Sequence, residues 1–154
     1  MHPPAEVRAT VDAYVALRGR IEAGEATWID LAAFFTDDAT YIDPAWGRIQ
    51  GIDEIRSFLV DSMRGLEDWR FPIRTVAIDG DDVVTVWTQI LPGARADGTP
   101  YQQTGVSILR YAGDGRFSYE EDLLNMAHVL EDLAASGWRP GPGFTPPPPN
   151  PIRQ

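Results

Sequence analysis

The sequence predicts an α+β fold in which a curved antiparallel sheet packs over three N-terminal helices. Up to about residue 63, apolar residues recur every three or four positions, as on one face of a helix. Between residues 69 and 124 the period changes to two, as in strands that are buried on one side. The turn sequences DGDD, PGARADG and AGDG divide this second part into four strands, which is the pattern of a meander.

Each of the three predicted helices follows a start signal. Pro3-Pro4 precedes the first, which ends at Gly24, and Thr27 with Asp30 resembles a capping box for the second. Gly51 precedes the third, whose first turn is acidic and suits the helix dipole. The apolar faces are Val7, Val11, Tyr14, Leu17 and Ile21 in the first helix, Trp28, Leu31 and Phe35 in the second, and Ile52, Ile55, Leu59 and Met63 in the third.

A short strand, ATYID, is expected between the second and third helices. Pro44 favours extended backbone at Asp43 and stops the strand there. The four later strands are expected in WRFPIRTVAI, DVVTVWTQIL, TPYQQTGVSILRY and RFSYEEDLL, and a last helix from Met126 to Ala135 ends near Gly137.

The length of 154 residues indicates one domain, which we expect to span residues 1–137. Residues 138–154 form a tail rich in proline, which favours polyproline II structure. Two alternatives are open for it. It is solvated, or it packs across its own subunit or a partner's, because Trp138 and Phe144 would otherwise be exposed.

Charge and composition exclude several classes of function. A net charge of −10 argues against binding to nucleic acid or to a membrane surface. The chain has no Cys and no Lys, which excludes a thiol nucleophile, a Schiff-base lysine and a P-loop lysine. No apolar run is long enough to cross a bilayer, and the start, MHPPAEVRATVD, lacks the features of a secretory signal, so we expect a cytoplasmic protein.

The reactive groups are therefore expected to be carboxylates and aromatic side chains. The two histidines, His2 and His128, lie at opposite ends of the chain, so no histidine cluster for a metal is expected. We expect no metal and no cofactor.

The two-residue period assigns side chains to the concave face of the sheet. Tyr41 and Asp43 share a face, and Trp46 follows closely. A carboxylate desolvated among aromatic rings has a raised pKa, which suits a general acid or base near neutral pH. On the later strands this face carries Val83, Thr85, Trp87 and Gln89, then Gln103, Gly105, Ser107 and Leu109, then Ser118, Glu120 and Asp122. The residues among them that we expect to line the pocket are Trp87, Gln89, Gln103, Ser107 and Glu120, with Asp122.

Each candidate also has a structural alternative. Asp43 before Pro44 is typical of a turn. Asp122 could cap the last helix, with Asn125 as a competing cap. Trp87 could be an ordinary core residue.

The order of elements resembles that of the nuclear transport factor 2-like superfamily, and the sequence is similar to its SnoaL-like branch over residues 5–130. The strongest part of the resemblance is FFTDDATYIDPAWGRIQGIDEIRSFL. This branch includes polyketide cyclases, limonene-epoxide hydrolase, scytalone dehydratase and ketosteroid isomerase. The resemblance implies a cone-shaped sheet with an internal apolar pocket and a homodimer formed through the outer face of the sheet.

The resemblance also implies roles for single residues. Asp43 matches the general base of ketosteroid isomerase, and Tyr14 is the candidate for its helix-borne Tyr, but Ser107 stands where that enzyme has a second Asp. Tyr41 with Asp43 resembles the Tyr-x-Asn pair of the epoxide hydrolases, and Asp122 matches an Asp near their chain end. The Arg-x-Asp element of those hydrolases is replaced by VWTQIL, so neither named reaction is implied.

We therefore expect a cofactor-independent isomerase, lyase, cyclase or hydrolase that acts on a hydrophobic small molecule. Asp43 is the expected base, Asp122 the acid or the residue that orients water, and Tyr14, Tyr41 and Ser107 are hydrogen-bond donors. The alternative is a non-catalytic ligand-binding or dimerisation module of the same fold. That alternative predicts acids that are exposed or neutralised by an arginine such as Arg48 or Arg110.

Overall fold

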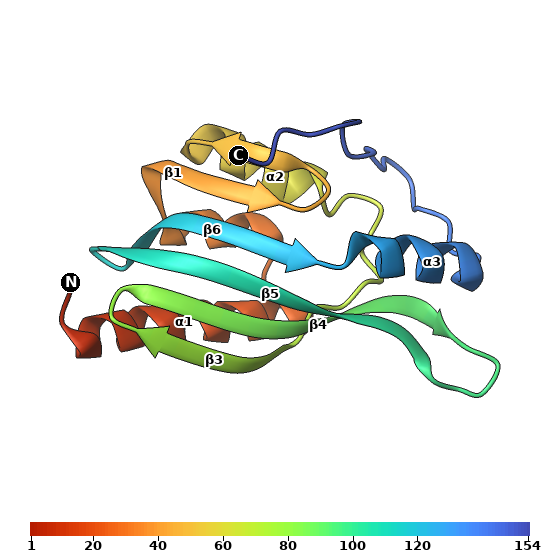
Figure 1. Cartoon of the computed structure of the whole chain (residues 1–154), viewed down its shortest axis with the longest axis horizontal. Helices are drawn as coiled ribbons and strands as arrows, with labels where there is room; N and C mark the ends of the chain where they lie inside the picture. The colour runs from red at the N-terminus through yellow and green to blue at the C-terminus, as the bar shows by residue number, and fades with distance from the viewer.

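The computed structural model of the protein describes residues 1–154 and contains a six-stranded sheet, three α-helices and one 3-10 helix (Figure 1). The helices are α1 (Pro4–Glu22), η1 (Trp28–Phe34), α2 (Ile52–Asp61) and α3 (Met126–Ser136). The strands are β1 (Phe35–Asp43), β2 (Gly47–Gln50), β3 (Ile73–Asp79), β4 (Asp82–Ala94), β5 (Pro100–Gly113) and β6 (Arg116–Leu124).

The sheet has the order β2-β1-β6-β5-β4-β3. The predicted four-stranded antiparallel meander is confirmed as β3 to β6. Strand β1 adds to it by pairing parallel to β6, with Tyr41 opposite Glu120. This pairing joins segments almost eighty residues apart, so no local pattern in the sequence could predict it.

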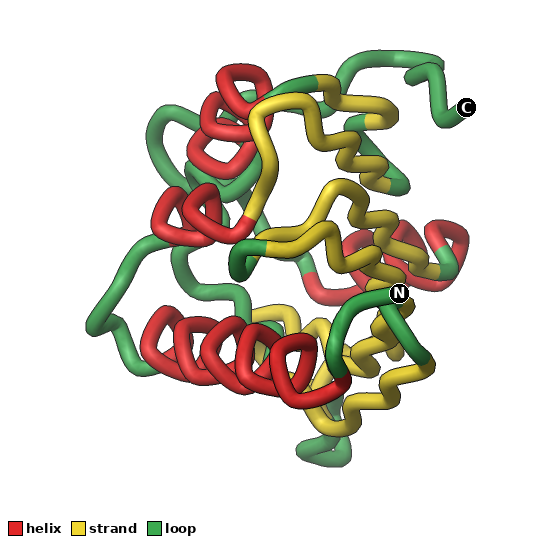
Figure 2. Tube along the Cα trace, turned by 90° about the vertical axis from the view of Figure 1, so that its left-hand side faces the viewer, coloured by secondary structure: helices red, strands yellow, loops and turns green.

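The N-terminal helices cover the concave face of the sheet, as expected for the cone. Figure 2 shows α1 and α2 on one side and the strands on the other. The main core lies between these layers and combines helix residues such as Val11 and Ile55 with strand residues such as Leu109 and Phe117. No helix is both long enough and apolar enough to cross a membrane.

The predicted helices are present, but Met63 lies beyond the end of α2 at Asp61, and the second helix is of another type. The capping box is present, because the backbone N–H of Thr27 donates to Asp30 Oδ2 at 2.9 Å. The segment behind it is a 3-10 helix, however, and Phe35 belongs to β1 and not to the helix. Strand β2 was not predicted, because four residues after a turn are too short to show a period.

The alternation predicted for the sheet is confirmed by burial. Thr85, Ser107 and Glu120 are all at most 1% exposed and lie on the concave face. On the same face, Trp87 lies opposite Gly105 in the neighbouring strand. A Cβ at Gly105 would come within 2.3 Å of the Trp87 ring, so the glycine allows the indole to lie flat against β5.

The proline-rich tail packs across its own subunit, which is the second of the two alternatives. Trp138 contacts Trp69 and Phe144 edge to face. The N–H of Gly141 donates to the carbonyl of Gly65 at 3.0 Å. Near its end the tail reaches the edge of β2, where the N–H of Arg48 donates to the carbonyl of Ile152.

We predict that Gly65→Ala detaches this tail. Gly65 has φ +85°, and a Cβ there would lie 2.8 Å from Phe144 Cβ and 3.1 Å from the carbonyl oxygen of Gly141. The matched control is Gly24→Ala, because Gly24 has φ +76° but no atom near its Cβ position. Both variants should lose about 1–2 kcal/mol of stability through the left-handed backbone.

Limited chymotrypsin digestion measures the difference. Cleavage at Trp138 and Phe144, identified by mass spectrometry, should accelerate in Gly65→Ala and stay at the wild-type rate in Gly24→Ala. Equal cleavage in both variants would show that Gly65 does not hold the tail.

Candidate active site

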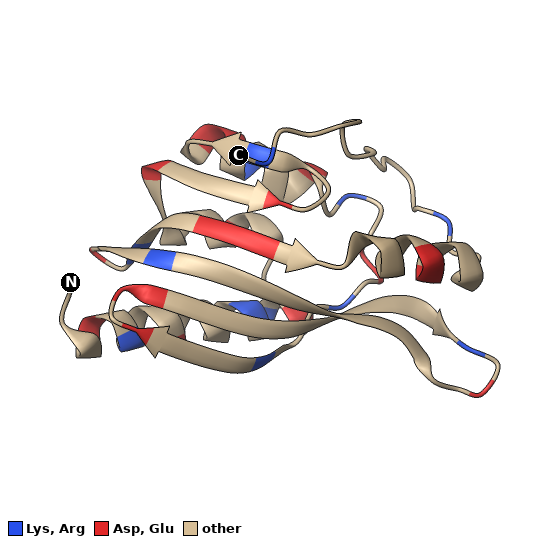
Figure 3. Ribbon diagram, viewed as in Figure 1, with Lys and Arg blue, Asp and Glu red and all other residues tan.

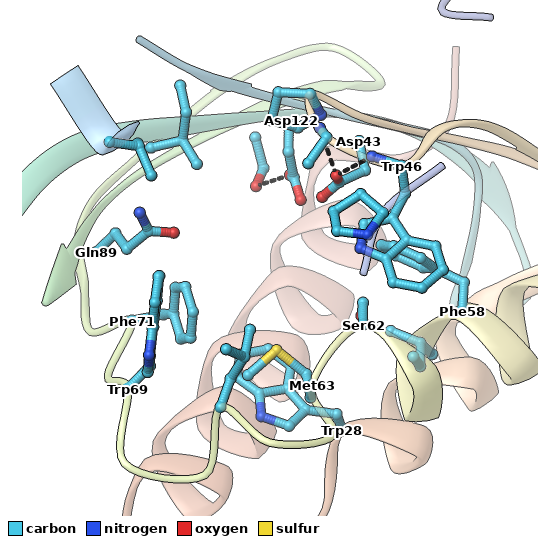
Figure 4. Close-up of a pocket in the computed structure, with 18 of the residues that line it drawn as sticks. Trp28, Asp43, Trp46, Phe58, Ser62, Met63, Trp69, Phe71, Gln89 and Asp122 are labelled. Carbon is cyan, nitrogen blue, oxygen red and sulfur yellow. Dashed lines mark hydrogen bonds between the residues drawn. The ribbon is translucent and has the colours of Figure 1, made fainter. Parts of the chain in front are cut away.

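A cavity of about 300 Å³ lies between the concave face of the sheet, α1, η1 and α2 (Figure 4). This volume is within the usual range for a small-molecule site. Helix α3 and the tail complete the wall, the tail through Trp138, Phe144, Thr145 and Pro147. The lining is mostly apolar, and the predicted pocket residues Tyr14, Tyr41, Trp46, Trp87, Gln89 and Ser107 all belong to it, together with Asp43 and Asp122.

Asp43 is both a turn residue and a pocket carboxylate. Its Oδ1 accepts the backbone N–H groups of Ala45 and Trp46, each at 2.8 Å, which closes the turn between β1 and β2. Both hydrogen bonds fall on Oδ1, so Oδ2 is left for a ligand. Figure 4 shows the carboxylate beside Trp46 with Asp122 nearby.

The pKa of Asp43 is raised to about 6. Burial is the larger cause, because the carboxylate leaves water for an apolar cavity, and the charge of Asp122 adds to it. The two turn hydrogen bonds oppose the rise by stabilising the ionised form. Asp43 is therefore mostly ionised at pH 7 and still able to take up a proton.

Asp122 is held by hydrogen bonds to both of its oxygens. Ser107 Oγ donates to Oδ1 at 2.5 Å, and Tyr41 Oη donates to Oδ2 at 2.6 Å. Trp87 Nε1 donates to Ser107 Oγ at 2.9 Å and so orients the hydroxyl. These donors lower the pKa of Asp122, but burial outweighs them and keeps it above its ordinary value.

The alternative role of Asp122 as a helix cap is wrong. Asn125 caps α3, because its Oδ1 accepts the backbone N–H of His128. His128 lies near this cap on the outside of α3, where its Nε2 faces the Asn125 amide.

Glu120 lies deeper, behind Tyr14 and Tyr41. Its Oε1 is 3.3 Å from both phenol oxygens, and its Oε2 has no partner. Because Tyr41 has one hydroxyl hydrogen and gives it to Asp122, its contact with Glu120 needs a proton from the Glu120 carboxyl. Burial raises the pKa of Glu120 well above its ordinary value, with the charge of Asp122 as the second cause. Glu120 is thus held in its neutral form.

Burial also raises the pKa of Tyr14 and of Tyr41 well above the ordinary value. Both residues are neutral phenols that can donate hydrogen bonds. Tyr14 lies on the buried face of α1 and contacts the cavity, as the sequence analysis expected for a helix-borne donor.

Two of the predicted pocket residues lie behind or beside the cavity. Glu120 is covered by the tyrosines and does not line it. Gln103 accepts a hydrogen bond from Gln89 at 2.8 Å and donates to Asp132 at 2.6 Å, so it faces a separate polar groove under α3. Gln103 is on the predicted face of the sheet, but it lies further along β5 than the cavity extends.

Arg18 is a pocket residue that the sequence analysis missed. It is only 6% exposed, donates to the carbonyl of Phe71 at 2.8 Å and lies over the Trp28 ring at 5.0 Å. The buried residues of α1 are spaced as 7, 11, 14 and 18, which places Arg18 on the apolar stripe. The same spacing in the sequence could have indicated Arg18, but the prediction continued the apolar face through Leu17 and Ile21 instead.

The arginines named by the alternative hypothesis lie elsewhere. Arg48 donates to Gln50, and Arg110 pairs with Asp82 at 3.0 Å, both at the surface. Figure 3 shows the acidic run along the middle of β6, which includes Glu120 and Asp122. No group of three or more His, Cys, Asp or Glu side chains is arranged to hold a metal ion.

We predict that Glu120→Gln is well tolerated and flattens the dependence of stability on pH. A neutral amide replaces a neutral carboxyl, so Glu120→Gln should not lower the free energy of unfolding, and at pH 6 it should raise it by up to about 2 kcal/mol, because the unfolded wild-type chain has already released this proton. At higher pH the unfolded wild-type chain releases this proton while the folded chain keeps it, so raising the pH lowers wild-type stability. The variant lacks this loss.

Urea unfolding at pH 6 and pH 8 measures the effect. Glu121→Gln is the control, since Glu121 is adjacent, lies on the outer face and bonds Tyr119 at 2.6 Å. A strong destabilisation by Glu120→Gln at pH 6 would show that Glu120 is ionised in the folded protein.

Comparison with known proteins supports this description of the fold. A family model described as a SnoaL-like domain matches residues 7–120. No curated protein matches the chain in sequence. A protein from Jannaschia sp. CCS1 described as a SnoaL-like polyketide cyclase superposes with a TM-score of 0.66 at 17% identity, covering 88% of this chain and 97% of its own.

Two further structures show the range of proteins with this fold. TerC, co-crystallised with polyporic acid, has a TM-score of 0.60 at 19% identity and covers 81% of this chain and 98% of its own. An LEH-like epoxide hydrolase from M. tuberculosis has a TM-score of 0.60 at 19% identity and covers 86% and 92%. At these identities the likeness concerns the fold, and the matched family model shows that the chain belongs to the SnoaL-like domain family.

Proposed function

We propose that this protein is a cofactor-independent enzyme that transfers protons to and from a hydrophobic small molecule. The observation that carries the proposal is the pair of carboxylates, Asp43 and Asp122, on the wall of one apolar cavity. Burial of two acids in one cavity is costly, and such sites are enriched at catalytic centres.

Asp43 acts as the general base. Its free Oδ2 faces the cavity, and a pKa of about 6 leaves it ionised at neutral pH while making it a stronger base than an exposed Asp. Pro44 and the turn hydrogen bonds fix its backbone, so the carboxylate does not need to reorganise before reaction.

Asp122 acts as the second group of the site. Its oxygens are occupied by Ser107 and Tyr41, so it is the residue that orients water or returns a proton through the Tyr41 hydroxyl. Tyr14, whose contact with Glu120 is a long 3.3 Å, adds a neutral donor that can stabilise negative charge on a substrate oxygen. Isomerisation, dehydration, cyclisation and addition of water all use such a base and donor, and the pocket supports each of them.

The second candidate function is a ligand-binding module without catalysis. Arg18 favours it in part, because its charge lies in the same cavity and lowers the pKa of both Glu120 and Asp122. The two functions differ in one measurable respect, which is turnover in a pocket that binds ligands.

Hydrogen exchange tests the base directly, without knowledge of the final product. The protein is incubated in D₂O with a panel of lipophilic ketones, and deuterium uptake next to the carbonyl is followed by NMR. We expect Asp43→Asn to slow the exchange by about 10²–10⁴-fold. The rate of the wild-type protein should rise with pH through about pH 6 and then level off, as Asp43 ionises.

Asp114→Asn is the matched control, since Asp114 is exposed in the β5–β6 turn at φ 51°, a conformation that Asn also adopts. Its exchange rate should equal that of the wild type. A loss of less than about tenfold in Asp43→Asn would remove Asp43 from the base role. Ligand binding without any exchange would favour the binding module.

We also propose a homodimer formed through the outer face of the sheet. Val86, Val106 and Leu123 lie in register across β4, β5 and β6 on that face, and Leu123 is 47% exposed. Such an apolar ladder suits a partner sheet.

Light scattering after gel filtration should therefore give twice the chain mass of 17.1 kDa. Leu123→Asp should give the single-chain mass, whereas Ile29→Asp, at a residue 41% exposed on η1, should not. A wild-type protein that elutes as a single chain would exclude the dimer.

A further inference from the structure

Arg18 is buried in the cavity with most of its hydrogen-bonding capacity unused. A guanidinium has five N–H donors, of which one donates to the carbonyl of Phe71 at 2.8 Å, and the Tyr14 hydroxyl is its other polar neighbour. Nε is buried and has no partner. Arg18 takes part in none of the ion pairs of the structure, which involve the N-terminus, His2 and other arginines.

A charge in this position needs compensation. Removing a guanidinium from water is costly unless its charge and its donors are satisfied. The Trp28 ring beneath it supplies a cation–π contact and holds the planar group in place. That contact fixes Arg18 but leaves the in-plane donors open, so the site is built for a further acceptor.

The cavity therefore contains a cationic group as well as the two acids. Figure 4 shows Asp43 and Asp122 on one side and Trp28 and Phe71 on the facing side, with Met63 beside Trp28. Arg18 contacts Trp28 and Phe71, so its guanidinium lies toward that side, while its charge still reaches Asp122 and lowers the pKa of that carboxylate. Between these sides the lining is aromatic and aliphatic.

We propose that the ligand of this pocket is an apolar ring compound that carries a carboxylate, and that Arg18 binds this carboxylate. The planar fork of arginine matches a carboxylate in two parallel hydrogen bonds. A ligand without an acceptor group would leave the guanidinium charge unpaired. The ring system would fill the aromatic part of the cavity and place its far end beside Asp43. This orientation rests on the proposed function, but binding at Arg18 does not.

Two matched probes test the proposal by binding alone. 2-Naphthoate and 2-naphthamide have the same ring and nearly the same shape, but only the first is charged at neutral pH. Their affinities can be followed through quenching of the tryptophans that line the pocket. We expect the wild-type protein to bind 2-naphthoate at least about tenfold more tightly than 2-naphthamide, as for a hydrogen bond between charged groups.

Arg18→Met should remove this preference and leave the affinity for 2-naphthamide within about threefold of the wild type. Arg18→Lys keeps the charge without the fork and should retain part of the preference. Arg74→Met is the control, because Arg74 is exposed on β3 and bonds Thr104. If Arg18→Met does not fold, the wild-type comparison and Arg18→Lys still decide.

Equal binding of both probes by the wild type, or no binding of either, would overturn the proposal. A preference that persists in Arg18→Met would also overturn it. Neither probe has a hydrogen on the carbon next to its carbonyl group, so carboxylate-catalysed proton abstraction from carbon cannot affect the result. A preserved preference together with absent ketone exchange would reject the proposed function and leave this inference standing.

Discussion

The burial of two neighbouring acids on the concave face of β6 is the constraint on which the rest of the site depends. Glu120 is buried and Asp122 half-buried when the sheet closes over the helices, and neither forms an ion pair with an arginine. They are stabilised instead by hydroxyl groups from three other elements, Tyr14 on α1, Tyr41 on β1 and Ser107 on β5. The helix and both neighbouring strands must therefore be in place before the acids can be buried.

The protonation states of the acids follow from this hydrogen-bond network. One phenol hydrogen cannot serve two carboxylates, so Tyr41 donates to Asp122 and Glu120 stays protonated. Both oxygens of Asp122 accept hydrogen bonds, and its negative charge helps to raise the pKa of the neighbouring Asp43. The least constrained carboxylate oxygen of the site is thus Asp43 Oδ2, on a rigid turn.

Much of the architecture was predictable because it depends on the local spacing of apolar residues and on local capping signals. The alternation in β4, β5 and β6 assigned the concave face correctly, and Thr27 with Asp30 marked a real helix start. The errors lie where local signals are short or compete. Strand β2 is four residues long, and Phe35 could extend a helix or begin a strand until its pairing with β6 decided for the strand.

By itself, the sequence determined which side chains can face the interior, because the spacing of residues along a helix or strand fixes their direction. It also determined that carboxylates, tyrosines and tryptophans supply the polar and aromatic groups of the pocket. Only the tertiary structure decided how far each side chain lies from the others. It left Gln103 outside the cavity, brought Arg18 inside, covered Glu120 with two tyrosines and laid the tail across the pocket. These outcomes depend on contacts between segments distant in the chain, and such contacts leave no periodic trace in the sequence.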